Sequence, residues 1–237
     1  MWAIYSWFAL GKRHDALCIH DDGTLSELDC STLCYLFPGS RLITKREADD
    51  VASVHLTSFP HILSLRKDNK LAMKLIDVRL FATTSRVVLL DSDAFTFGDM
   101  GDLENLCVGN SNAFMADCQF AFSLTKEGFA KLNALTSYIP INSGFGYIHK
   151  DSINLPAIES ILEVAPEIRT QDYWTEQTLY ALLSSDYGIK LLGPEFRVAR
   201  GAGLDGIRLK HYVSMTRGFA YVEGIPRLNT LIRSCMS

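Results

Sequence analysis

The sequence predicts an α/β fold in which a mostly parallel central sheet is flanked by helices. Short apolar stretches alternate along the chain with longer stretches of helical periodicity, which is typical of such folds. The stretch Val87-Val88-Leu89-Leu90 is too short for an ordinary helix and rich in β-branched residues, so it indicates a strand buried on both faces. The length of 237 residues suits one domain that spans positions 1–237.

In the first part of the chain, an aromatic-rich helix is expected over residues 1–10, packed on the sheet. A short strand over 16–20 should stop at the turn Asp21-Asp22-Gly23, because Asp and Gly favour turns. The next expected elements are a helix over 28–37, a strand over 40–43, and two helices, over 46–57 and Lys70–Phe81.

In the second part, residues 113–121 are expected to be extended and residues 125–138 to form an amphipathic helix. A strand over 139–148 carries two glycines, which suit close approach by a ligand or by another backbone. Helices should follow over Leu155–Val164 and over 175–185, the second capped by Thr175 and stopped by Gly188. The remainder of the chain is expected to be rich in loops.

The composition is that of a soluble globular enzyme. Hydrophobic residues make up 48%, charged residues 21%, and the net charge is −4, so no basic field is available for nucleic acid. The six cysteines contain no Cys-X-X-Cys pair, and we expect them to be reduced in a cytoplasmic compartment. The apolar first ten residues are too short for a transmembrane segment and lack the preceding basic residues of a signal peptide, although peripheral membrane contact stays open.

Two carboxylates one residue apart, Asp91 and Asp93, follow the predicted buried strand. Ligands of open α/β sheets bind outside the carboxyl ends of the strands, so this pair should lie where a ligand crevice opens. Both carboxylates can reach one divalent cation, which could then hold a diphosphate. An Asp-Ser-Asp sequence can also start a turn or cap a helix, and this alternative stays open.

Five short motifs, in their order along the chain, resemble those of glycosyltransferases with the GT-A fold. The resemblance is to the glycogenin-like family 8 branch and its bacterial relatives, and it covers the chain from about residue 16 onward. The motifs are Asp21-Asp22-Gly23, Asp91-Ser92-Asp93, Asn142-Ser143-Gly144, Glu176-Gln177 and His211. The resemblance implies transfer of a sugar from a nucleoside-diphosphate sugar, with a UDP-sugar favoured, to an unknown acceptor.

The resemblance implies that Asp91, Asp93 and His211 ligate Mn²⁺ or Mg²⁺. The segment from His211 to Arg217 resembles the family pattern of His, an aromatic residue, Gly and a later Lys. It departs from that pattern because Ser214 stands in place of Gly and Arg217 in place of Lys. Arg preserves the charge and can pair with a diphosphate in a bidentate manner. A histidine that merely packs or faces solvent is the competing interpretation of His211.

The other motifs supply candidates for binding the donor and for catalysis. Lys74 and Asp77, neighbours on one helix, could orient Asp91 or touch phosphate, whereas Arg66 and Lys70 are better explained as a solvated charged face. The implied donor-binding residues are Asp22, Lys74, Asp77, Asn142, Ser143, Gly144 and Arg217.

Glu176 and Gln177 are the candidates for catalysis. Glu176 could be a general base in an inverting enzyme, whereas a retaining enzyme needs none and Gln177 could lie under the anomeric carbon. Structural alternatives stay open for these residues. The segments around Asp22 and Asn142 could simply be turns, and Glu176 could simply complement the helix dipole.

Proteins of this family normally begin with a strand that holds the nucleotide base. The sequence shows no such strand before the first helix, so we expect it to be missing. A protein of this fold that binds a partner or carbohydrate without catalysis is therefore the alternative function. A nucleotidyltransferase is disfavoured because no glycine-rich basic loop follows an early strand.

Overall fold

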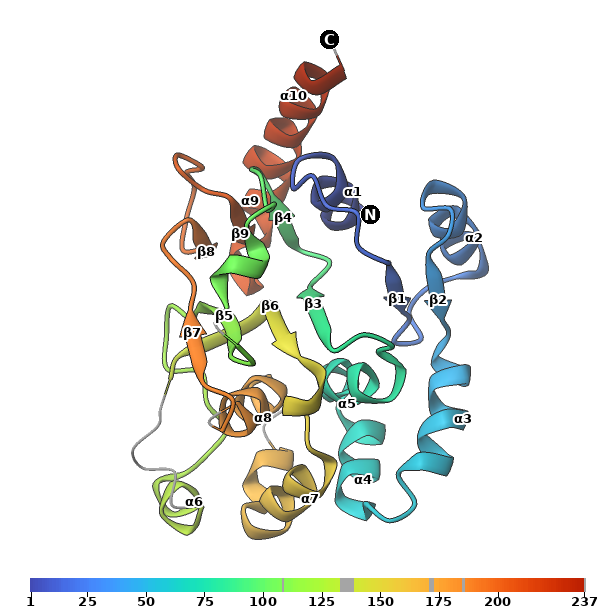
Figure 1. Ribbon diagram of the computed structural model, residues 1–237, viewed down its shortest axis with the longest axis vertical. Helices are drawn as coiled ribbons and strands as arrows, with labels where there is room; N and C mark the ends of the chain where they lie inside the picture. Colours follow the sequence, from blue (N-terminus) through green and yellow to red (C-terminus); the bar gives the residue numbers. More distant parts are fainter. Residues whose placement is uncertain (108, 133–138, 171–172, 185, 237) are drawn as a thin grey trace.

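The computed structural model describes residues 1–107, 109–132, 139–170, 173–184 and 186–236. Its strands form three sheets (Figure 1). The strands are β1 (Cys18–His20), β2 (Arg41–Ile43), β3 (Arg86–Leu90), β4 (Ala94–Thr96), β5 (Asn112–Ala116), β6 (Ile141–His149), β7 (Ile189–Leu191), β8 (Phe196–Val198) and β9 (Leu209–His211). The sheets have the orders β1-β2, β3-β6-β5-β7 and β4-β9-β8.

Helices separate most of these strands along the chain. The α-helices are α1 (Trp2–Ala9), α2 (Glu27–Leu36), α3 (Lys45–His55), α4 (Pro60–Asp68), α5 (Lys70–Phe81), α6 (Lys126–Lys131), α7 (Leu155–Val164), α8 (Thr175–Leu183), α9 (Arg217–Phe219) and α10 (Ile225–Met236). Short helical turns of other types are η1 (Leu103–Leu106), η2 (Lys150–Ser152), η3 (Pro166–Thr170), η4 (Ser214–Thr216) and η5 (Ala220–Gly224). Among the described residues, none of the helices combines the length and apolar character needed to cross a membrane.

The α/β class is confirmed, but the central sheet is mixed rather than mostly parallel. Strand β6 runs antiparallel to both β3 and β5, and β7 pairs with β5 in parallel. The strand buried along nearly all its length is β6, which lies inside the four-stranded sheet. Strand β3 is at the edge of that sheet, so of its residues only Leu89 is fully buried, contrary to the prediction of a strand buried on both faces.

The hydrophobic core lies on both sides of β6. One cluster joins Phe114 and Ile148 to helices α4, α5, α7 and α8, which Figure 1 shows gathered near one end of β6. A second cluster joins Phe145 to Trp7 of α1 and Phe196 of β8. Successive strand residues point to opposite faces, so Phe145 and Ile148 belong to different clusters. Strand β6 therefore runs through the centre of the molecule, and packing on both of its faces fixes the position of its first residues.

Several helix starts follow from local sequence. Ser26 and Asp29 form a capping box at α2, and Thr44, Asn69 and Asn154 cap α3, α5 and α7 with side-chain oxygens. At α8 the prediction was wrong, because Trp174 is the N-cap and Thr175 donates its hydroxyl to the carbonyl of Ile168. The predicted helix over 125–138 begins as expected, and its part over 133–138 lies outside the described residues.

Candidate metal centre

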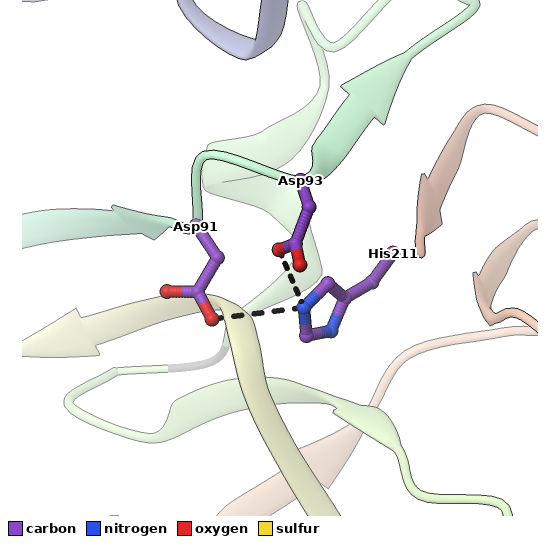
Figure 2. Close-up of side chains that lie close together, drawn as sticks. All are labelled: Asp91, Asp93 and His211. Atoms are coloured by element: carbon purple, nitrogen blue, oxygen red, sulfur yellow. Dashed lines mark hydrogen bonds and ion pairs between the residues drawn. The ribbon is translucent and has the colours of Figure 1, made fainter. Parts of the chain in front are cut away.

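Asp91, Asp93 and His211 lie together at the junction of β3, β4 and β9 (Figure 2). Each offers one ligand atom, and these atoms all lie within 4.8 Å of one another. The His211 Nε2 atom is 3.0 Å from Asp93 Oδ1 and 3.6 Å from Asp91 Oδ2. The ring of His211 therefore faces both carboxylates across one small space.

Backbone pairing fixes all three positions. Asp91 directly follows β3, and its N–H donates to the Gly144 carbonyl. The next strand, β4, pairs with β9 so that Ala94 lies opposite His211. The carbonyl of Asp93 accepts a bond from the N–H of Tyr212. The tight turn between β3 and β4 and the pairing of β4 with β9 thus bring residues distant in sequence to one place.

Asn142 at the start of β6 sets the tautomer of His211. The Asn142 amide nitrogen donates to Asp117, so its Oδ1 faces the histidine and accepts from Nδ1 at 2.8 Å. With a proton on Nδ1, the ring turns Nε2 toward the two carboxylates, where it donates to Asp93 when the ring is protonated and offers a lone pair to a cation when it is neutral. The donor set of two carboxylates and one oriented imidazole therefore fits a divalent metal ion.

Lysine and arginine side chains hold the carboxylates from the outside. Lys74 of α5 donates to Asp91 Oδ1 at 2.7 Å, which leaves Oδ2 toward His211, and Arg217 donates to Asp93 Oδ2 at 2.9 Å. Burial opposes ionisation of Asp93, but His211 and Arg217 outweigh it and lower the pKa of this carboxyl. Burial also opposes the charge of Lys74, yet Asp91 and Glu176 raise its pKa. The contacts of Asp93 keep its carboxyl group ionised, as metal ligation requires.

Behind Lys74, the residues Glu176 and Gln177 begin helix α8 and are buried. Glu176 lies 3.2 Å from the Lys74 ammonium and accepts from the Ser143 hydroxyl at 3.0 Å. Burial raises the pKa of Glu176 to about 7, although Lys74 acts in the opposite direction and the charge of Asp91 adds to the rise. The amide of Gln177 donates to the Ala121 carbonyl. Both side chains are thus held in place beside the metal centre.

Gly144 provides space for His211. A Cβ atom at this position would lie 2.0 Å from His211 Nδ1, far inside any permitted contact. The sequence predicted a small residue here for close approach of a donor sugar, whereas in the structure the approaching group is the imidazole. The glycine is therefore required by the histidine's position.

Asp117 belongs to the site and was missed in the sequence. It follows β5 and accepts from the amide of Asn142 at 2.9 Å, with Gln177 Nε2 at 3.4 Å. A carboxylate directly after a buried strand is the signal that drew attention to Asp91, and the same signal at 112–117 would have found Asp117.

Two predicted donor-binding residues have other partners. Asp22 lies after β1 and accepts from Thr24 at 2.6 Å, and Asp77 is buried in a salt bridge with Arg66 at 2.7 Å. Arg66 is itself only 5% exposed and also binds Asp49, so its interpretation as a solvated residue was wrong. Lys70 is largely exposed, as expected. Neither Asp22 nor Asp77 contacts the three ligand residues in the described part of the chain.

The fold and this centre can be compared with known proteins. Solved structures that resemble the chain are glycosyltransferases of the GT-A type. The galactosyltransferase LgtC, solved with donor and acceptor sugar analogs, has a TM-score of 0.61 at 14% identity over 97% of this chain and 88% of its own. Mouse xyloside xylosyltransferase 1 gives 0.54 at 12% identity over 89% of both chains.

A third similar structure is the glycosyltransferase GlyE of Streptococcus pneumoniae, with a TM-score of 0.53 at 15% identity over 98% of this chain and 58% of its own. These likenesses show that the chain has the GT-A glycosyltransferase fold, as the sequence predicted. No protein-family model matches the chain. No curated protein matches it either.

Proposed function

We propose that the protein is a metal-dependent glycosyltransferase that moves a sugar from a nucleoside-diphosphate sugar to an acceptor hydroxyl. The observation that carries the proposal is the convergence of Asp91, Asp93 and the oriented His211 within 4.8 Å at one end of β3. The GT-A fold supports it, because the solved proteins of similar fold are named glycosyltransferases.

The ligand chemistry favours Mn²⁺ or Mg²⁺. Both ions accept carboxylate oxygens and keep coordination positions for water and phosphate oxygens. A bound ion of this kind would neutralise charge on the departing diphosphate. Among nucleotides, UDP is the first to test, because the resemblance in sequence is to enzymes that use UDP-sugars.

The chain's own residues have separate proposed tasks. Lys74 and Arg217 place positive charge beside the ligand carboxylates, where they can also attract phosphate. Asn142 and Gly144 position His211, and Ser143 links Glu176 to the same strand. Asp22 and Asp77 stay proposed donor-binding residues, and in the structure their side chains contact Thr24 and Arg66.

Glu176 and Gln177 are the proposed contacts to the transferred sugar. In the structure Glu176 contacts Lys74 and Ser143, and its raised pKa of about 7 suits a group that takes up a proton near neutral pH. We therefore keep both roles as proposals: Glu176 as the general base of an inverting reaction, or Gln177 under the anomeric carbon in a retaining reaction that needs no dedicated base.

Calorimetry with UDP, with and without Mn²⁺, tests the proposal. We expect UDP to bind only with Mn²⁺, and Asp93→Asn to weaken that binding and to slow release of UDP from UDP-sugars by about 10²–10³-fold. Asp50→Asn, which makes the same change on an exposed carboxylate of α3, should match the unaltered protein. Absence of UDP binding with Mn²⁺, or UDP binding without turnover of any sugar donor, would overturn the proposed transfer and favour the non-catalytic alternative.

A further inference from the structure

A cavity of about 360 Å³ lies between the end of β5 and strand β8. Its lining includes Ala116, Cys118, Phe196, Arg197, Val198 and Arg200. The exposed lining residues Ala116 and Pro194 supply apolar surface and both arginines are exposed, whereas Phe196 and Val198 are buried and contribute little. Cavities of this size hold small molecules of about one or two sugar rings.

The strands that line the cavity pair with strands that carry residues of the metal centre. Ala116 pairs with Ile141, the residue before Asn142, and is followed by Asp117, which binds Asn142. Val198 lies opposite His211 in the β8–β9 pair. The two lining strands, β5 and β8, therefore each pair with a strand that carries a proposed ligand of the ion or a residue that orients one.

The cavity has an excess of positive charge. Arg197 and Arg200 have no hydrogen-bond or ion-pair partner among the described residues, and no acidic side chain lines the cavity with them. Two partly buried arginines elsewhere in the fold, Arg13 and Arg208, pair with carboxylates. Two unpaired guanidinium groups beside apolar surface can bind a small organic molecule that has an anionic group.

We propose that this cavity is the acceptor subsite and that the acceptor is a sugar that carries a phosphate group. The inference rests on the proposed function and names its acceptor class. Two guanidinium groups match the double charge of a phosphate monoester, and the exposed apolar surface of Ala116 and Pro194 suits the C–H face of a sugar ring.

The phosphate takes no part in the bond changes. An acceptor hydroxyl oxygen bonds to the anomeric carbon of the donor sugar. The bond from that carbon to the diphosphate oxygen breaks, and its electron pair leaves with the nucleoside diphosphate. The hydroxyl proton passes to that leaving group or to water, and the acceptor keeps its phosphate.

Equilibrium binding of glucose 6-phosphate and of glucose provides the test, because the two probes differ only in the phosphate. We expect glucose 6-phosphate to bind at least about tenfold more tightly, and the double variant Arg197→Gln/Arg200→Gln to remove the difference. The matched control Arg46→Gln/Arg227→Gln changes two exposed arginines of α3 and α10 and should preserve it. Equal binding of the two probes, or an unchanged difference in the cavity variant, would overturn the inference.

A second measurement places the probe in the unaltered protein. Cys118 lines the cavity and Cys34 is an exposed thiol of α2, so alkylation of both can be followed by mass spectrometry of their peptides. Glucose 6-phosphate should slow alkylation of Cys118 and leave Cys34 unaffected. Equal rates at Cys118 with and without the probe count against the cavity as its binding site.

The two proposals fail separately, because these measurements need neither metal nor nucleotide. If UDP binds with Mn²⁺ while glucose 6-phosphate shows no advantage over glucose, only the acceptor class is wrong. If glucose 6-phosphate protects Cys118 but UDP never binds, the cavity site stands and the transfer reaction does not.

Discussion

At the scale of single residues, the centre depends on how His211 is oriented. Its ring lies between the Asn142 amide and two carboxylates, and the Asn142 amide is in turn fixed by Asp117. Outer contacts of this kind set which imidazole nitrogen faces a metal, and their loss typically lowers metal affinity. The chain Asp117–Asn142–His211 is therefore as much a part of the centre as the ligands.

Gly144→Ala tests this orientation directly. The new methyl group would lie 2.0 Å from His211 Nδ1, so the ring must leave its place and we expect Mn²⁺ affinity to fall by about 10–100-fold. Free Mn²⁺ measured by electron paramagnetic resonance reports the affinity.

Gly146→Ala is the matched control for that variant. It lies on the same strand, and its added methyl group would meet the Phe114 ring at 2.9 Å instead of the histidine. It should lower stability and leave Mn²⁺ affinity unchanged. Undiminished affinity in Gly144→Ala would show that the ring position does not matter.

The candidate ligand residues could be predicted because their chemical character and spacing are visible in the sequence. Asp91 and Asp93 follow an apolar strand one residue apart, and the order of later motifs drew attention to His211. The salt bridge between Asp77 and Arg66 could not be predicted. Arg66 lies on another helix, and its sequence context is that of an ordinary surface residue. Burial of a charged pair depends on tertiary packing, which no local pattern records.

At the scale of elements, segments marked by periodicity, capping or turn residues were predicted well, and segments without such local signals were not. The bounds of α5 and α7 match the expected ranges, because apolar spacing and capping residues mark both helices. Helix α4 was missed, and strands β8 and β9 lie in a region expected to be rich in loops. The equally short β1 was predicted because the turn Asp21-Asp22-Gly23 follows it, whereas the conformation of β8 and β9 is decided by the pairing of β9 with β4 and with β8.

The attachment of β1 to α5 is an element-scale feature with a pH dependence. His20 of β1 lies 3.7 Å from Asp77 and packs edge-on against Phe81, while Arg66 holds the same Asp77 carboxylate. Burial lowers the pKa of His20, but Asp77 and Cys18 outweigh it and raise it from 6.5 to about 9.

The sign of the effect follows from this raised pKa. Below pH 6.5 the stabilisation is fully present, and it is lost as the pH rises through about 9, because the unfolded chain releases this proton first. The free energy of unfolding should fall by less than about 1.4 kcal/mol for each pH unit in that window.

Urea unfolding at pH 6, 7.5 and 9 measures this dependence. His20→Gln should flatten it, whereas His55→Gln, at an exposed position of α3, should keep it. Parallel curves for His20→Gln and the unaltered protein would show that this contact has no part in the pH dependence.

At the scale of the whole molecule, the fold brings together segments that the sequence keeps far apart. Asp93 and His211 are 118 positions apart, and only the mixed order of the sheets makes them neighbours. The α/β class followed from alternation of elements, but the antiparallel placement of β6 did not, since strand direction is set by long-range pairing. The site could thus be anticipated as a set of residues, and its geometry could not.

An ion in this centre should stabilise the whole molecule, because it would tie the turn between β3 and β4 to β9 only in the folded state. Binding to the native state alone at a hundredfold excess over Kd adds about 2.7 kcal/mol, which for a chain of this size raises Tm by about 5–10 °C. Thermal unfolding with Mn²⁺ and after addition of EDTA measures the shift. Asp93→Asn should lose most of it, because one carboxylate is replaced by a neutral amide, while Asp50→Asn should retain it. An identical Tm with Mn²⁺ and with EDTA would mean that the three side chains lie together without holding an ion.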